Sequence, residues 1–173
     1  MPAGRPGLLC REPFVKIAPT RNLPKDFALI IGAMKSGTSS LFNYLAGHPE
    51  IAACEIKEPH FFAYEENWLK GMQWYRSLWR WRPGQHKIAL EATAAYAKRP
   101  YVPHVPERIA EVKEAEFRFI YVLRHPLERL ESHSLHVSVA EGVKPLDEEI
   151  PQHAIWASQY AMQLDAYERF GRD

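Results

Sequence analysis

This chain of 173 residues has no long apolar run, only two cysteines and almost no net charge, and each of these features excludes a class of protein. No run of 18 apolar residues occurs, so the sequence predicts no transmembrane helix. Two cysteines, Cys10 and Cys54, are too few for a disulfide framework, and we expect both to be free thiols in a reducing compartment. A net charge of +1 gives no overall attraction to nucleic acid or to an anionic membrane, so any anion site has to be local.

The first 24 residues lack the features of a secretory signal. Prolines interrupt the segment at positions 2, 6, 13, 19 and 24, so it contains no continuous apolar stretch. Its basic residues resemble a transit peptide only faintly, because they show no helical period. We expect residues 1–25 to form a proline-rich arm, followed by one domain over residues 26–173. The lack of an export signal favours the cytoplasm.

From residue 26 onward, strand-length apolar runs alternate with helical patterns. Residues 27–31 form a continuous apolar run that predicts a buried parallel strand, and residues 117–123, rich in aromatic and β-branched side chains, predict a second one. Residues 87–91 form a weaker strand candidate. Helices are predicted over residues 38–47, 66–80, 105–112, 126–140 and 154–170. This alternation predicts an α/β fold with a mostly parallel sheet flanked by helices, whose ligands bind beyond the carboxyl ends of the strands.

The helix predicted over residues 66–80 carries a stripe of large apolar side chains. The stripe consists of Trp68, Met72, Tyr75 and Trp79, which recur at spacings of four and three. Such spacing places them on one face of a helix. A sugar-stacking platform would have the same composition, but we favour packing into the core.

A glycine-rich loop, GAMKSGTSS over residues 32–40, follows the first strand and opens the first helix. Its glycines permit a tight turn, and the helix start contributes free amides with a partial positive charge. Lys35 supplies a full charge, and further donors come from Ser36, Gly37, Thr38, Ser39 and Ser40. The loop therefore predicts a phosphate site. It differs from the Walker A pattern, in which lysine directly follows the second glycine, because Thr38 occupies that position here.

A second anion-binding pattern, R-x-P-x-x-R-x-x-S, follows the other strong strand. Arg124 is expected at the strand end, Pro126 at the start of the helix, and Ser132 about two turns along it. A guanidinium group suits bidentate phosphate binding. A structural alternative is an ion pair between Arg124 and Glu128.

These segments closely resemble the PAPS-dependent sulfotransferases, which use 3′-phosphoadenylyl sulfate (PAPS) as donor. The likeness rests on two segments, GAMKSGTSSLFNYLAGHPEI and RHPLERLES, which occur in the family's order and about ninety residues apart. It is strongest to the heparan sulfate N- and 3-O-sulfotransferase branch and its bacterial relatives. It implies a P-loop-like three-layer fold and binding of the 5′-phosphosulfate by the first segment. No metal is expected, because the histidines form no cluster with ligand spacing. It also implies that Arg124 and Ser132 hold the 3′-phosphate.

The segment KEPHFF over residues 57–62 resembles the part of that branch in which a glutamate is the base. An acceptor hydroxyl has to lose its proton as it attacks sulfur, so a base is needed. The resemblance assigns that role to Glu58. His60 is the rival, because the two side chains share a face if the segment is extended.

One departure from the branch concerns the acceptor. Relatives commonly carry E-K-T-P-x-Y after the next strand, and this chain has EATAAY over residues 91–96, with Ala92 in place of the lysine. A cationic contact is missing there, which leaves the acceptor open: a hydroxyl or an amine, on a carbohydrate or a small molecule. Lys98 and Arg99 are the candidates to compensate for the missing lysine.

Two other functions fit parts of the pattern. A P-loop kinase or NTPase would need Mg²⁺ and an aspartate at a strand end, where this chain has Arg124. An inactive nucleotide-binding fragment is the other alternative. The resemblance ends near Asp173 without the C-terminal segment of the relatives, so we expect the N-terminal and central part of a domain that by itself binds PAPS weakly and self-associates.

Overall fold

The computed structural model describes residues 23–141 and 150–171. The N-terminal arm and Cys10 lie outside these residues. Four parallel strands form one sheet in the order β2-β3-β1-β4. The strands are β1 (Asp26–Gly32), β2 (Ile51–Ala53), β3 (Ile88–Ala92) and β4 (Glu116–Tyr121). The predicted α/β fold with a parallel sheet is confirmed for the described residues.

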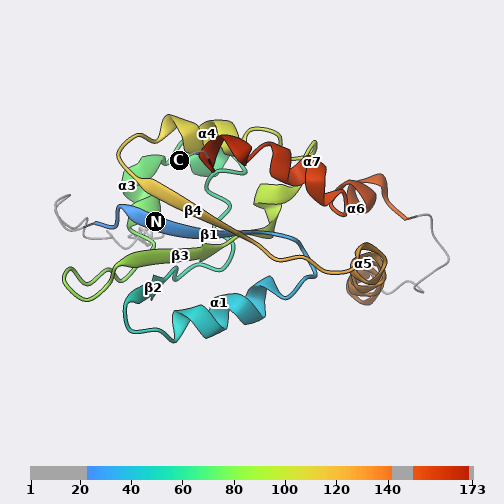
Figure 1. The fold of residues 1–173 in the computed structure, drawn as a ribbon, viewed down its shortest axis with the longest axis horizontal. Helices are drawn as coiled ribbons and strands as arrows, with labels where there is room; N and C mark the ends of the chain where they lie inside the picture. Colours follow the sequence, from blue (N-terminus) through green and yellow to red (C-terminus); the bar gives the residue numbers. More distant parts are fainter. Residues whose placement is uncertain (1–22, 142–149, 172–173) are drawn as a thin grey trace, which may run out of the picture.

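The central strand β1 explains why its sequence is a continuous apolar run. It pairs with β3 on one side and β4 on the other, and helices cover both faces of the sheet (Figure 1). Phe27, Leu29 and Ile30 are fully buried as a result. A strand that is buried on both faces has no solvent face on which polar residues could alternate.

The helices form layers on either side of this sheet. The α1 helix (Thr38–Ala46) lies on one side, and α4 (Val105–Glu111) and α7 (Tyr160–Asp165) lie on the other (Figure 1). The α5 helix (Pro126–Glu141) lies beyond the carboxyl ends of the strands, next to α6 (Gln152–Trp156). Both phosphate-site candidates therefore open at that end of the sheet, as predicted.

Two of the predicted helices are wrong in extent. The segment 66–80 forms two short helices, α2 (Glu65–Trp68) and α3 (Gly71–Arg76), because Gly71 adopts a φ of 76° between them. The apolar stripe is nevertheless core: Tyr75 and Trp79 are buried, and Trp68 and Met72 pack against them. The sequence analysis also missed β2 and extended β4 two residues too far.

The segment 154–170 divides into α6, α7 and a 3₁₀ turn, η3 (Glu168–Phe170). A single side chain fixes the break between the first two. The fully buried amide of Gln163 donates to the carbonyls of Arg99 (2.9 Å) and Trp156 (3.0 Å), and its oxygen accepts from the Arg99 amide (2.8 Å). The contacts with Arg99 join residues 64 positions apart, so the helical period alone could not reveal the break.

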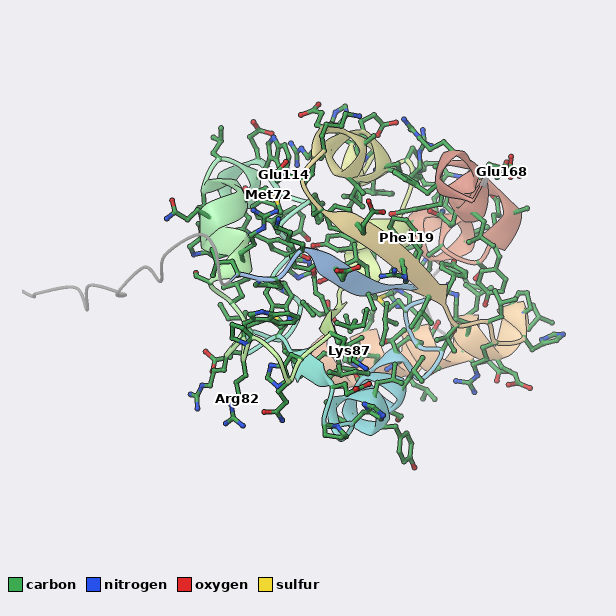
Figure 2. The ribbon with its side chains drawn as sticks, turned by 60° about the vertical axis from the view of Figure 1, so that its left-hand side comes forward. Met72, Arg82, Lys87, Glu114, Phe119 and Glu168 are labelled. Atoms are coloured by element: carbon green, nitrogen blue, oxygen red, sulfur yellow. The ribbon has the colours of Figure 1, made fainter. Side chains whose placement is uncertain are left out.

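Aromatic rings fill the core between the sheet and the helices. Phe61 stacks on Tyr75 with centroids 4.4 Å apart, and Phe27 lies 5.3 Å from Tyr75. Phe119 of β4 lies beside the C-terminal segment (Figure 2), with its ring 5.1 Å from that of Tyr167. Such contacts anchor segments that are far apart in sequence to one sheet.

Among the glycines that the structure describes, Gly32 at the end of β1 is the most tightly packed, and we expect it to tolerate no side chain. A Cβ on Gly32 would lie 2.8 Å from Cε2 of Tyr121 and 3.2 Å from Cβ of Ala97. Gly32→Ala should therefore lower the free energy of unfolding by about 1–3 kcal/mol, measured by urea denaturation. Gly47→Ala is the control, because its Cβ meets nothing closer than 3.4 Å. Equal stability of the two variants would contradict the packing described here.

Candidate active site

The loop between β1 and α1 has the geometry expected of an anion-binding turn. Lys35 and Gly37 adopt left-handed conformations, with φ of 68° and 88°. The Ser36 amide donates to the Ala33 carbonyl (3.2 Å), which closes the turn. The first turn of α1 has no side-chain cap and no acidic residue, so its amides remain available to an anion.

The side chains of the loop also suit a phosphate. Lys35 is half-buried, and Ser36 Oγ is buried without a hydrogen-bond partner among the described residues. A buried hydroxyl of this kind is costly unless it gains a partner. A phosphate oxygen would supply one. Thr38, Ser39 and Ser40 follow in the first turn of α1.

Backbone hydrogen bonds bring the second motif to this loop. The Ala33 amide donates to the Val122 carbonyl (2.9 Å), and the Val122 amide donates to the Gly32 carbonyl (2.7 Å). The guanidinium of Arg124 then donates to the Lys35 carbonyl (3.3 Å). Two motifs 89 residues apart in sequence are therefore in direct contact.

Arg124 itself differs from the expectation in two respects. It lies three residues beyond the end of β4, rather than at the strand end. It also forms the alternative ion pair with Glu128, with Nε 3.2 Å from Oε2. The pair is exposed at the start of α5, where such contacts contribute little and an incoming phosphate can replace them. Ser132 is half-buried further along α5.

A pocket of about 270 Å³ joins the start of α1 to the segment after β2. Its wall consists of Thr38, Ser39, Phe42, Asn43, Cys54, Glu55, Ile56, Lys57, Glu58 and Ala92. The candidate base Glu58 and the phosphate loop therefore face one cavity. Ala92 lies in the same wall, so the alanine that replaces a lysine of the relatives is at the pocket surface.

Glu58 and His60 adjoin each other, but not by strand alternation as expected. Both adopt left-handed backbone conformations, with φ of 50° and 53°, and Nε2 of His60 lies 3.7 Å from Oε2 of Glu58. Burial lowers the pKa of His60, an effect that the negative charge of Glu58 opposes. Both side chains remain partly exposed, at 38% for Glu58 and 27% for His60, so an acceptor can reach either.

The sequence analysis missed a buried carboxylate behind the pocket. Glu91 of β3 is fully buried and accepts hydrogen bonds from the Tyr75 hydroxyl and from Thr93 Oγ1, the latter at 2.6 Å. Burial raises the pKa of Glu91, which these hydrogen bonds oppose and the charge of Glu58 reinforces. Because its oxygens are bound inside the core, Glu91 is unsuited to hold Mg²⁺ and instead fixes the end of β3 next to Ala92.

Two more basic residues of this part of the chain are partly or fully buried. Lys98 follows the 3₁₀ turn η2 (Ala94–Ala97) and is half-buried; burial lowers its pKa, and Glu58 opposes that shift. Arg129 of α5 is completely buried. The motif R-x-P-x-x-R-x-x-S contains Arg129 at its second arginine, but only the structure shows that this side chain turns into the protein.

Neither a metal cluster nor a membrane span is found over residues 23–141 and 150–171. No group of three or more His, Cys, Asp or Glu side chains there is placed to hold a metal ion. None of the helices in those ranges is long and apolar enough to cross a membrane.

Comparisons with known proteins agree on one family. The model described as "Sulfotransferase domain" matches residues 25–167. Heparan sulfate glucosamine 3-O-sulfotransferase 5 of Mus musculus is 34% identical over 122 residues, which cover 70% of this chain and 32% of the relative. Heparan sulfate glucosamine 3-O-sulfotransferase 6 of Homo sapiens is 35% identical over 127 residues, covering 73% and 33%. This chain thus spans about a third of the length of these curated relatives.

A solved structure supports the same grouping. The crystal structure of a sulfotransferase from Alicyclobacillus acidocaldarius matches with a TM-score of 0.62 and 28% sequence identity. The match covers 86% of this chain and 70% of that one.

The hydrogen bond from Tyr75 to Glu91 should contribute measurably to stability. Tyr75→Phe removes one donor to a buried carboxylate and should lower the free energy of unfolding by about 1–3 kcal/mol. The loss should be larger at pH 8 than at pH 5, because Glu91 has a raised pKa and needs the donor most when ionised. Tyr44→Phe, at a residue 82% exposed, is the control for urea denaturation. A loss independent of pH would count against the role given to Glu91.

Proposed function

This chain belongs to the sulfotransferase domain family, and we propose that it transfers a sulfuryl group from PAPS to a carbohydrate acceptor. The observation that carries the proposal is the contact between two phosphate-binding motifs at the edge of one pocket. Arg124 touches the backbone of Lys35, and the same loop shares its pocket with Glu58. Donor, acceptor and base can therefore meet at one place.

The two motifs divide the nucleotide between them. The loop amides, Lys35 and the first turn of α1 bind the 5′-phosphosulfate, as the free amides and the unpartnered Ser36 hydroxyl suggest. Arg124 and Ser132 bind the 3′-phosphate. The guanidinium of Arg124 exchanges its exposed contact with Glu128 for the phosphate, which carries more charge.

The transfer step needs positioning and charge stabilisation rather than a metal. The acceptor hydroxyl attacks sulfur in line, a new oxygen–sulfur bond forms, and the bond from sulfur to the phosphate oxygen breaks. Glu58 takes the hydroxyl proton. Lys35 and the amides at Gly37 and Thr38 stabilise the charge that appears on the 5′-phosphate of the leaving adenosine 3′,5′-bisphosphate.

His60 remains the rival base. Its lowered pKa keeps the imidazole neutral near pH 7, and a neutral imidazole can accept a proton. The proximity of His60 to Glu58 also fits a role in orienting the carboxylate. The acceptor class rests on the curated relatives, whose names refer to heparan sulfate glucosamine. The cytoplasmic location expected from the sequence stays a prediction.

Nothing in the structure favours the kinase alternative. Beyond β4 the chain continues into Arg124, and the carboxylate of β3, Glu91, is bound by Tyr75 and Thr93 inside the core. Titration calorimetry without metal separates the two functions. Binding of adenosine 3′,5′-bisphosphate supports the proposal, and selective binding of Mg·ATP contradicts it.

Replacing the base should separate chemistry from binding. Glu58→Gln should leave affinity for adenosine 3′,5′-bisphosphate within about twofold and lower the rate of sulfuryl transfer by about 10²–10⁴. The amide cannot accept the acceptor's proton. His60→Ala is the matched variant, followed by the same transfer assay. If Glu58→Gln stays active while His60→Ala does not, the base is His60.

Replacing Arg124 should affect only ligands with a 3′-phosphate. Arg124→Ala should weaken PAPS binding by about 1.5–3 kcal/mol, because a charge-assisted hydrogen bond is lost. Affinity for adenylyl sulfate, which lacks the 3′-phosphate, should be nearly unchanged in calorimetry. Arg118→Ala, at another exposed arginine paired with an acid, is the control. Equal weakening of both ligands would show that Arg124 has another role.

A further inference from the structure

Most of the pocket wall around Glu58 is uncharged. Seven of the ten residues that line the pocket have neutral side chains. Burial raises the pKa of the Cys54 thiol to about 12, so Cys54 belongs to this neutral group at pH 7. The seven are Thr38, Ser39, Phe42, Asn43, Cys54, Ile56 and Ala92.

The three charged side chains of the wall do not give the pocket a positive field. Glu55 forms an ion pair with Arg80 on the surface, where solvent screens both charges. Lys57 is exposed, and among the residues that the structure describes it is the one cation in the wall. Glu58 is half-buried, and its partner His60 is neutral near pH 7, because burial lowers the pKa of that imidazole. The charge that is most sheltered from solvent is therefore negative.

Helix α1 turns one face into the pocket. Thr38 and Phe42 are four residues apart, as are Ser39 and Asn43, so each pair lies on one side of the helix, one turn apart. This face presents two hydroxyls and an amide beside an aromatic ring, a combination of apolar surface and a few hydrogen-bonding groups that suits a small neutral ligand. The volume of about 270 Å³ is below the range of about 300–1,000 Å³ for drug-sized ligands, so one sugar ring fits better than several.

The basic groups of the two phosphate motifs are already assigned to the donor. Lys35 and Arg124 are not part of the pocket wall, and in the proposed function both bind phosphates of PAPS. An acidic group of the acceptor inside the pocket would thus lie beside Glu58 with Lys57 at the surface as its cation. Like charges repel more strongly in a half-buried pocket than in water, because the effective dielectric constant is lower there.

We propose that the pocket takes an uncharged sugar unit of the acceptor and selects against a unit that carries a sulfate or carboxylate. The attacking hydroxyl lies at Glu58, Asn43 binds a further hydroxyl, and the apolar face of the sugar lies against Phe42. Ala92 determines this preference, because its methyl group at the end of β3 leaves this part of the wall without a charge. The inference rests on the proposed function, since it names the acceptor class of that same site.

Two glycosides that differ in one charge test the preference. The p-nitrophenyl β-glycosides of N-acetylglucosamine and of N-sulfoglucosamine have the same hydroxyls, but only the second carries a negative charge. Transfer is followed as release of adenosine 3′,5′-bisphosphate from saturating PAPS. The kcat/KM of the original chain for the N-acetyl glycoside should exceed that for the N-sulfo glycoside about tenfold or more. An equal or higher kcat/KM for the N-sulfo glycoside would overturn the proposal.

A charge introduced at position 92 should reverse the preference. Ala92→Lys places an ammonium group in the wall and should lower the ratio of the two kcat/KM values about tenfold. Ala92→Met is the matched control, because it adds a side chain of similar length without a charge and should leave the ratio unchanged. The KM for PAPS should be the same in both variants. Equal changes of the ratio in the two variants would show that size rather than charge decides, and the proposal would fail.

Binding without turnover supplies a test on the original chain that needs no variant. Adenosine 3′,5′-bisphosphate is added to saturation, and each glycoside is titrated while saturation transfer from the protein to its protons is followed by NMR. The N-acetyl glycoside should bind about tenfold more tightly than the N-sulfo glycoside. Equal affinities, or no binding of either glycoside, overturn the proposal. If the N-acetyl glycoside binds preferentially but receives no sulfuryl group, the proposed function fails while the preference of the pocket stands.

Discussion

The candidate site depends on two backbone hydrogen bonds that join the ends of β1 and β4. They run from the Ala33 amide to the Val122 carbonyl and from the Val122 amide to the Gly32 carbonyl. Without them the phosphate loop and the segment with Arg124 would leave the sheet independently. The close approach of the two backbones requires Gly32, whose missing Cβ makes room for the ring of Tyr121. The parallel pairing of β1 with β4 connects these two hydrogen bonds to the core of the sheet.

The core behind the site combines apolar packing with one buried carboxylate. Aromatic rings from segments far apart in sequence surround Tyr75, and the hydroxyl of Tyr75 binds Glu91. A buried carboxylate costs free energy unless its oxygens are bound, and here Tyr75 and Thr93 bind both. The end of β3 is thereby fixed at the pocket wall, where Ala92 leaves space. Apolar packing and the hydrogen bonds to Glu91 thus set the shape of the cavity together.

Charge is distributed unevenly in a chain that is almost neutral overall. Basic groups gather at the carboxyl end of the sheet, where Arg124 donates to the carbonyl of Lys35 and Lys57 lines the pocket. Two acids, Glu55 and Glu58, line the pocket together with Thr38 and Ser39 at the start of α1. A site for a charged donor needs such a local field, and a net charge of +1 could not provide it. The balance between one base and several cations is what suits the proposed chemistry.

The sequence by itself determined the fold class, the two candidate phosphate-binding motifs and the edge at which they open. Continuous apolar runs, the glycine loop and R-x-P-x-x-R-x-x-S are local patterns, and local patterns survive without tertiary information. The family likeness singled out Glu58 and His60; their roles stay predictions. The tertiary structure decided the breaks in the helices at Gly71 and before Tyr160, the core position of Glu91 and the burial of Arg129. These features depend on partners such as the Arg99 backbone for Gln163 and Ser158 for Arg129, which lie 64 and 29 residues away. Sequence periodicity relates only residues that lie within a few helical turns of one another. Contacts between residues this far apart in sequence therefore cannot be inferred from it.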